Sequence, residues 1–187
     1  MPIKPILFNT EMVRAILDGR KSCTRRIIKP QPQGYFEVSE EPLYIYDTDG
    51  KQGKITPPYQ PGDILYVRET WKQAPNGYYY YEDWQRNDIA DVTKWHPSIH
   101  MPKEAARIWL KVTDVRVERL QEMWASDVPK EGIYFNKPTT ADEMLMAFAK
   151  LWNSTIKKSD IDCYGWNANP VVWVIEFERC EKPTEMR

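Results

Sequence analysis

The sequence predicts an α+β domain with a mostly antiparallel, barrel-like sheet. Strand-like apolar segments recur along the chain, whereas only two or three segments have the spacing of amphipathic helices. The 187 residues, 42% of them hydrophobic, are enough to bury a core, and this length favours one domain. We therefore expect a single domain over residues 1–187, with an insertion at about 72–102.

A short strand and a short helix are expected first. Residues 4–8 have the character of a strand, and Asn9 is a typical N-cap for a helix over about 10–18. Gly19 then suits the left-handed position that ends a helix. The following residues, 22–28, have extended character, so this junction lies at a loop edge, where functional groups are often displayed. Its candidate functional side chains are those of Lys21 and Thr24.

The middle of the chain is expected to add strands and the insertion. Residues 41–55 indicate a strand that leads into an Asp-Gly turn at 49–50. The sequence Pro61-Gly62-Asp63 indicates a turn before a strand at 64–67. Residues 72–102 contain four consecutive tyrosines and few aliphatic residues, so we expect them to pack on the sheet from outside.

The last third is expected to supply a long strand, a helix and a closing strand. Within residues 106–120 the apolar phase shifts near Thr113 and Asp114, which predicts a β-bulge. A short helical turn follows at 126–133. A capping box then begins a helix over about 140–154, and the β-prone segment VVWVIEFERC forms the final strand.

The charge distribution leaves two interpretations open. A net charge of −1 argues against a protein that coats nucleic acid over its whole surface. Residues 1–30, however, contain seven basic and two acidic side chains, a local net charge of +5. This excess indicates either a local binding patch or a solvated face.

Cysteine and histidine usage points to a cytoplasmic protein without metal or cofactor. The three cysteines are widely spaced and include no CxxC pair, so neither a zinc site nor a disulfide framework is predicted. His96 and His100 are four residues apart, but Pro97 follows the first and no glutamate lies between them. No apolar run approaches the length of a membrane span, and we expect no membrane association.

Several motifs follow one another along the chain: GxKxxxxR ending at Arg26, PGDILYVRETW, VERL, LQEMWASDVPKEGI and VWVIEFERC. Their order resembles that of the ASCH domain, a member of the PUA-like superfamily. The longer ASCH versions of phages and prophages are the most similar, and residues 72–102 fall outside the minimal domain. The resemblance implies a PUA-like β-barrel flanked by helices, with a cleft beside the first helix for RNA or a modified nucleoside.

The resemblance also implies catalytic residues. Some small bacterial members are amidohydrolases that remove the acyl group from N(4)-acetylcytidine with a Lys, a Thr and a Glu. In this sequence the three correspond to Lys21, Thr24 and Glu131. Other ASCH-like proteins are associated with RNA binding without chemistry or with nuclease action, so the family leaves an enzyme and a reader both open.

Amide cleavage by these side chains requires a hydroxyl with a base within reach. Lys21 and Thr24 are close enough in sequence to meet across a turn. The lysine pKa must fall from ~10.4 to ~7, which costs about 4–5 kcal/mol. A like charge from Arg25 or Arg26 at ~6 Å would supply about 2.8 kcal/mol, and burial the rest. Glu131 can orient Lys21 or move a proton; alternatively the two only form a salt bridge and Thr24 satisfies a backbone group.

Five further side chains are candidates for binding nucleic acid or substrate. Arginine forks suit phosphate and base oxygens, a second carboxylate can border the cleft, and an aromatic ring can stack on a base. These candidates are Arg20, Arg25, Arg26, Glu69 and Trp71. Cys23 is a weaker alternative nucleophile, because a cysteine there more often acts as a small buried hydrophobe.

Three functions therefore stay open: an amidohydrolase acting on a modified cytidine, a non-catalytic RNA reader, and an adaptor that binds a host protein through residues 72–102. The sequence does not predict the oligomeric state.

Overall fold

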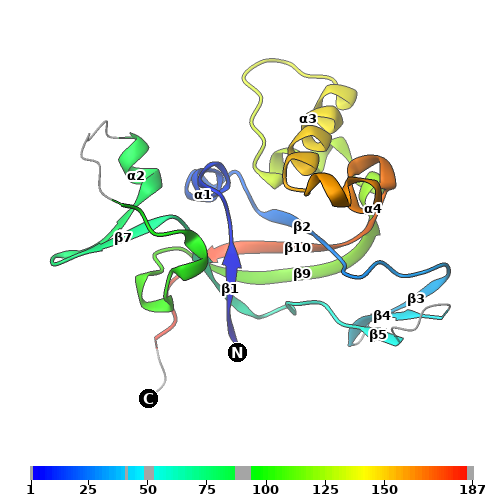
Figure 1. Ribbon diagram of the computed structural model, residues 1–187, viewed down its shortest axis with the longest axis horizontal. Coiled ribbons are helices and arrows are strands. Elements are labelled where there is room, and N and C mark those ends of the chain that lie inside the picture. Colours follow the sequence, from blue (N-terminus) through cyan, green and yellow to red (C-terminus); the bar gives the residue numbers. More distant parts are fainter. Residues whose placement is uncertain (1, 41, 49–52, 87–93, 185–187) are drawn as a thin grey trace.

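The computed structural model describes residues 2–40, 42–48, 53–86 and 94–184. Its centre is a five-stranded sheet in the order β1-β6-β9-β10-β2 (Figure 1). Only β1 and β6 pair in parallel, and the other neighbours are antiparallel. The strands are β1 (Ile3–Leu7), β2 (Cys23–Ile27), β6 (Ile64–Arg68), β9 (Trp109–Arg119) and β10 (Val171–Cys180). The predicted α+β fold with a mostly antiparallel sheet is confirmed.

Strand β10 is buried on both faces, as its continuous apolar run favours. Trp173 and Ile175 belong to a cluster that includes the buried residues of helix α1 (Thr10–Leu17). Val172 and Val174 point to the opposite face, into a second cluster with helix α3 (Ala141–Ser154). The edge strands β1 and β2 are linked by Arg26, whose Nη2 donates to the carbonyl of Leu7 at 2.8 Å.

Smaller elements extend the two ends of the central sheet (Figure 1). One end has a three-stranded sheet of β3 (Phe36–Glu40), β4 (Leu43–Asp47) and β5 (Gly53–Ile55). The other end has the hairpin of β7 (Trp71–Ala74) and β8 (Gly77–Tyr80), followed by α2 (Tyr81–Arg86). Strand β3 is absent from the sequence prediction, and the predicted turn at 49–50 lies outside the described residues.

The described part of residues 72–102, the predicted insertion, packs against the end of the sheet near β6 and β9. Trp71 and Met101 are buried in one cluster with Tyr66 and Trp109 of these strands. No helix in the described part of the chain has the length and apolar character needed to cross a membrane.

The predicted β-bulge is present in β9. Glu176 of β10 faces Asp114, whereas the next residue, Phe177, faces Val112. Thr113 is therefore the extra residue of the bulged strand. Because of this extra residue, Val112 and Val115 are both buried despite their odd spacing.

Local capping signals define the helices as predicted. The Asn9 side chain accepts a hydrogen bond from the backbone N–H of Met12, and Gly19 has a positive φ of 72°. The capping box joins Thr140 and Glu143 at the start of α3. Helix α4 (Ile161–Tyr164) lies beside α3.

Residues 126–133 differ from the single helical turn that was predicted. Two 3-10 turns, Ala125–Asp127 and Pro129–Glu131, occupy this segment. Gly132 ends the second turn with φ 97° and approaches α1 closely.

Gly132→Ala is expected to lower the free energy of unfolding by about 2–3 kcal/mol, since strain and a steric clash act together. The added Cβ would lie 2.9 Å from the Cβ of Ala15 and 3.3 Å from Cδ of Lys21. Urea denaturation measures this loss. Gly19→Ala is the matched control, because its φ is also positive but its added Cβ meets no atom within 4 Å; we expect a loss of about 1 kcal/mol. Equal losses would contradict the steric contribution.

Candidate functional site

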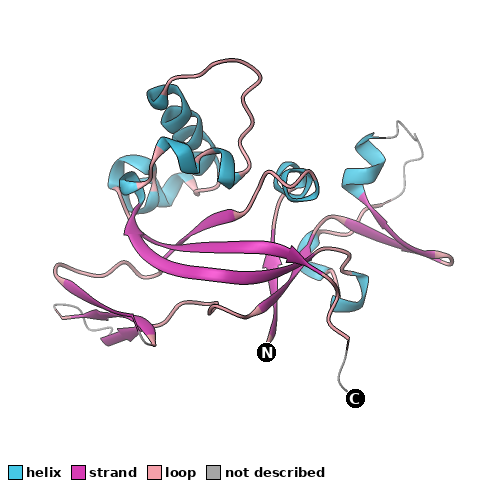
Figure 2. Ribbon diagram, turned by 180° about the vertical axis from the view of Figure 1, so that it is seen from behind, coloured by secondary structure: helices cyan, strands magenta, loops and turns pink. Residues whose placement is uncertain are grey.

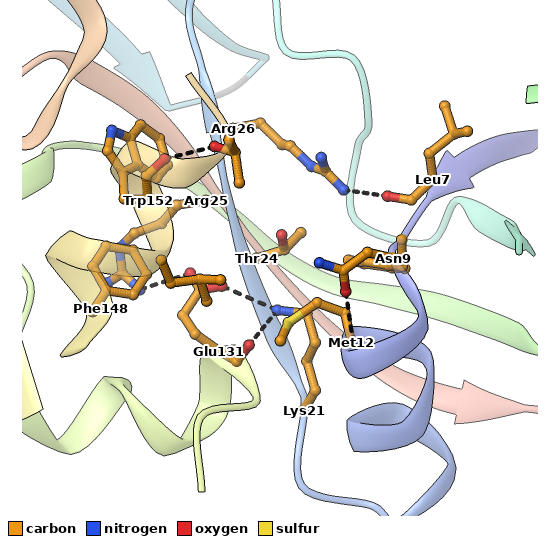
Figure 3. A pocket seen from close by; sticks show the side chains of 13 residues that line it. Leu7, Asn9, Met12, Lys21, Thr24, Arg25, Arg26, Glu131, Phe148 and Trp152 are labelled. Atoms are coloured by element: carbon orange, nitrogen blue, oxygen red, sulfur yellow. Dashed lines mark hydrogen bonds and ion pairs between the residues drawn. The ribbon is translucent and has the colours of Figure 1, made fainter. Parts of the chain in front are cut away.

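A cavity of about 240 Å³ lies between α1, β2, the Pro129–Glu131 turn and α3 (Figure 3). In the view of Figure 2 both helices appear above the long strands, although they pack against opposite faces of β10. The structure brings all three predicted catalytic residues to this cavity, together with Arg25 and Arg26. Apolar side chains of α1 and α3 complete the lining, notably Met12, Phe148, Leu151 and Trp152.

Lys21 is a buried cation whose donors are all used. Its Nζ donates to the carbonyls of Cys23 at 2.8 Å and Glu131 at 2.7 Å, and to Glu131 Oε2 at 3.1 Å. These acceptors match the three N–H groups of an ammonium. Burial lowers the pKa of Lys21, and the charge of Glu131 opposes this shift. The salt bridge considered from the sequence is therefore present, and it coexists with a depressed lysine pKa.

Arg25 holds the carboxylates of three separate segments. Its Nε donates to Glu118 at 2.6 Å, Nη1 to Glu131 at 3.1 Å and Nη2 to Asp127 at 3.2 Å. Burial alone would lower the pKa of Arg25, but the charges of Glu131 and Glu118 outweigh it and raise the pKa. Arg25 consequently fixes Glu131, and its charge is compensated inside the protein. Burial, with a smaller contribution from Arg26, accounts for the lowered Lys21 pKa.

Thr24 is buried, and its hydroxyl has no hydrogen-bond partner in the part of the chain that the structure describes. It lies on β2 between Lys21 and Arg26 and lines the cavity (Figure 3). No hydrogen bond joins it to Lys21 among the described residues, since the Lys21 ammonium is directed to Glu131 and Cys23. The Thr24 hydroxyl is thus free for a ligand.

Arg26 and Asn9 present further donors to the cavity. Arg26 uses Nη2 to reach Leu7, and its guanidinium lies 5.3 Å from the ring centre of Phe8. Burial lowers the pKa of Arg26. The Oδ1 of Asn9 accepts a hydrogen bond from Met12 N–H at 2.9 Å, so the NH₂ group of the same amide takes no part in this helix cap. Both side chains line the cavity.

The remaining predicted binding residues lie outside this lining. Arg107 donates to both Glu69 oxygens at 2.9 Å, and Trp71 packs against the rings of Tyr78 and His96. Glu69 and Trp71 thus lie at the end of the sheet where the β7–β8 hairpin begins. Arg20 donates to Gly132 O and to Asp18, both at 3.1 Å, beside α1.

Sequence reasoning missed the apolar wall of the cavity. Asn9 was assigned only as a helix cap, and Phe148 and Trp152 only as the core-facing side of a helix. Both assignments are correct locally, because Asn9 caps α1 and both aromatic side chains are buried. The capping box at Thr140 and the apolar stripe of α3 located the helix, but no signal in the sequence shows that this face meets β2.

Cys23 is poorly suited to act as a nucleophile. Burial raises the pKa of its thiol to about 12, with a further contribution from Glu131. The thiol is therefore protonated at neutral pH, whereas the nucleophilic form is the thiolate. Among the described residues, no group of three or more His, Cys, Asp or Glu side chains is arranged to hold a metal ion.

Comparison with known proteins gives a match among solved structures alone. No family model and no curated protein matches the chain. Three solved structures match, and the first is an ASCH domain. This ASCH domain, from Lactobacillus crispatus JV V101, shares 9% identity at a TM-score of 0.47, covering 95% of this chain and 79% of that one. It is the domain that the motif order resembles.

The other two matches are more distant in shape. Hypothetical protein PH0355 has 14% identity and a TM-score of 0.38, with 96% of this chain and 100% of that chain covered. Protein PF0455 from Pyrococcus furiosus has 12% identity and a TM-score of 0.37, with 97% of this chain and 100% of that chain covered.

Proposed function

We propose that the cavity binds the base of an N(4)-acylated cytidine and that the protein hydrolyses its amide. The observation that supports this most directly is a buried threonine hydroxyl that has no partner among the described residues, in the same cavity as a buried lysine and glutamate. The cavity volume of about 240 Å³ lies just below the ~300–1,000 Å³ of typical small-molecule sites, which favours one base over a larger ligand.

The cavity offers mainly donors to a ligand. The Asn9 amide and the Arg26 guanidinium donate, while both Glu131 oxygens are occupied by Lys21 and Arg25. A fitting base therefore presents acceptors, as cytosine does through O2 and N3, and the acyl oxygen adds another. The rings of Phe148 and Trp152 provide flat walls for stacking.

In the proposed reaction the Thr24 oxygen bonds to the acyl carbon, and its proton passes to the neutral amine of Lys21. The bond from the acyl carbon to the exocyclic nitrogen then breaks. Lys21 returns the proton to this nitrogen, which leaves as the amino group of cytidine. Water hydrolyses the acyl-threonine ester, releasing the carboxylic acid and restoring the hydroxyl.

This role requires Lys21 to lose one proton and with it one of its three hydrogen bonds. A neutral amine has two N–H groups and a lone pair, so one of its acceptors is released and the lone pair becomes available. Burial favours the neutral amine, and a ligand that displaces water from the cavity strengthens that effect.

The test is to incubate the purified protein with N(4)-acetylcytidine and to measure cytidine by chromatography. We expect cytidine from the wild type and none above background from Lys21→Met, which keeps an unbranched side chain without the ammonium. Circular dichroism checks that both proteins are folded. A folded wild type that forms no cytidine would contradict hydrolysis.

A non-catalytic reader of RNA is the second candidate function. It is favoured by the hydrogen bonding of Lys21, whose three N–H groups all have acceptors. This arrangement suits a charged lysine with a structural role and not only a lysine that takes up a proton during catalysis. Salt separates the two candidates: binding through several phosphates weakens steeply as salt rises, whereas turnover of an uncharged nucleoside barely responds.

A further inference from the structure

A second cavity of about 330 Å³ adjoins the first. The two share Arg25, Arg26, Trp152 and Thr155, so they meet where β2 faces the end of α3. The second cavity continues along β2 to Lys29 and past α3 to Lys157. A ligand in the first cavity would therefore lie next to the second.

The second cavity has an excess of positive charge. Arg26, Lys29 and Lys157 line it, together with Arg25 and a single carboxylate, that of Asp160. In the described part of the chain none of these three cations is in an ion pair: Arg26 reaches a backbone carbonyl, and Lys29 Nζ lies 4.6 Å from the ring centre of Tyr164. Arg25 differs, because three carboxylates compensate its charge.

Uncompensated cations at the edge of a base-sized cavity favour an anionic group attached to the base. We propose that Arg26, Lys29 and Lys157 bind a phosphate on the ribose of the nucleotide whose base occupies the first cavity. Arg26 lines both cavities and has donors left beyond the one used on Leu7, which suits bidentate contact with phosphate oxygens. This proposal rests on the proposed function and specifies it, since the preferred ligands become nucleotides or RNA in place of free nucleosides.

Isothermal titration calorimetry with four probes tests the phosphate subsite. The probes are N(4)-acetylcytidine, its 5′-monophosphate, its 3′-monophosphate and a single-stranded trinucleotide with this base in the middle. We expect at least one phosphorylated probe to bind about tenfold more tightly than the nucleoside. The double variant Lys29→Ala/Lys157→Ala is expected to lose this gain and to bind the nucleoside as the wild type does.

Lys54→Ala/Lys72→Ala is the matched control, because it removes two lysines on β5 and β7 that do not line either cavity. It is expected to keep the gain. A gain with either monophosphate identifies a free nucleotide as a sufficient source of the phosphate, and a gain with the trinucleotide alone identifies the RNA backbone.

Two results overturn the proposal in distinguishable ways. If the nucleoside binds and phosphate adds nothing, or if the gain persists in Lys29→Ala/Lys157→Ala, the phosphate subsite is wrong while base binding stands. If no probe binds to the folded wild type, base binding in the first cavity is wrong as well.

Discussion

Thr24→Val is expected to lower the rate of N(4)-acetylcytidine hydrolysis by about 10³-fold or more. Valine has nearly the shape of threonine, so the cavity keeps its form while the only group proposed to attack the acyl carbon is removed. The hydroxyl has no partner among the described residues, so its loss leaves no other group unsatisfied. Single-turnover chromatography measures the rate, and calorimetry measures the affinity for the same nucleoside.

The affinity in Thr24→Val is expected to stay within about threefold of the wild type, since the Asn9, Arg26 and aromatic contacts are unchanged. Thr113→Val is the matched control, because it makes the same substitution at the exposed bulge of β9. It is expected to turn over normally. A fully active Thr24→Val would exclude Thr24 as the nucleophile and would leave water as the attacking group.

Glu131→Gln is expected to lower the free energy of unfolding by about 3–5 kcal/mol, the usual cost of leaving buried charges without their partner. The Glu131 side chain is 6% exposed and compensates Lys21 and Arg25, whose side chains are 2% and 0% exposed. Glutamine keeps the volume but turns an NH₂ group toward one of two cations. Because small domains are stable by only ~5–15 kcal/mol, this loss is a large share of the total.

Urea denaturation measures the effect of Glu131→Gln, and Glu178→Gln on the exposed end of β10 is the matched control, with an expected change within about 0.5 kcal/mol. The double variant Lys21→Met/Glu131→Gln separates charge from packing. Its loss of unfolding free energy is expected to be smaller than the sum of the losses in the two single variants, because one of the two uncompensated cations is gone. Strictly additive losses would show that the pair is not coupled.

Local signals in the sequence predicted most of the fold. The Asn9 cap, the phase shift at Thr113 and the capping box at Thr140 each act within a few residues, so they can be recognised without tertiary information. Strand β3 was missed because its sequence, FEVSE, is polar at positions that remain largely exposed. Its pairing with β4 is a tertiary contact that no local pattern indicates.

Five of the predicted side chains line the cavity, but the sequence did not indicate how they are paired. Arg25 and Arg26 are neighbours in a basic run, and nothing in that run distinguishes them. On β2 they start from opposite faces, and both line the two cavities, but Arg25 meets carboxylates from distant segments whereas Arg26 donates to the backbone carbonyl of Leu7. Those carboxylates, Glu118, Asp127 and Glu131, lie about a hundred residues further along the chain.

The close approach at Gly132 gives the two walls of the cavity different mechanical properties. On one side the turn lies so close to α1 that a Cβ added at Gly132 would meet Ala15, and Ser22 N–H, which follows α1, donates to the Lys130 carbonyl at 2.9 Å. On the other side α3 borders the cavity with side chains, and it follows the connection 133–140, which contains no helix or strand. For the proposed function we therefore expect the α1 wall to orient the base and α3 to adjust to acyl groups of different size.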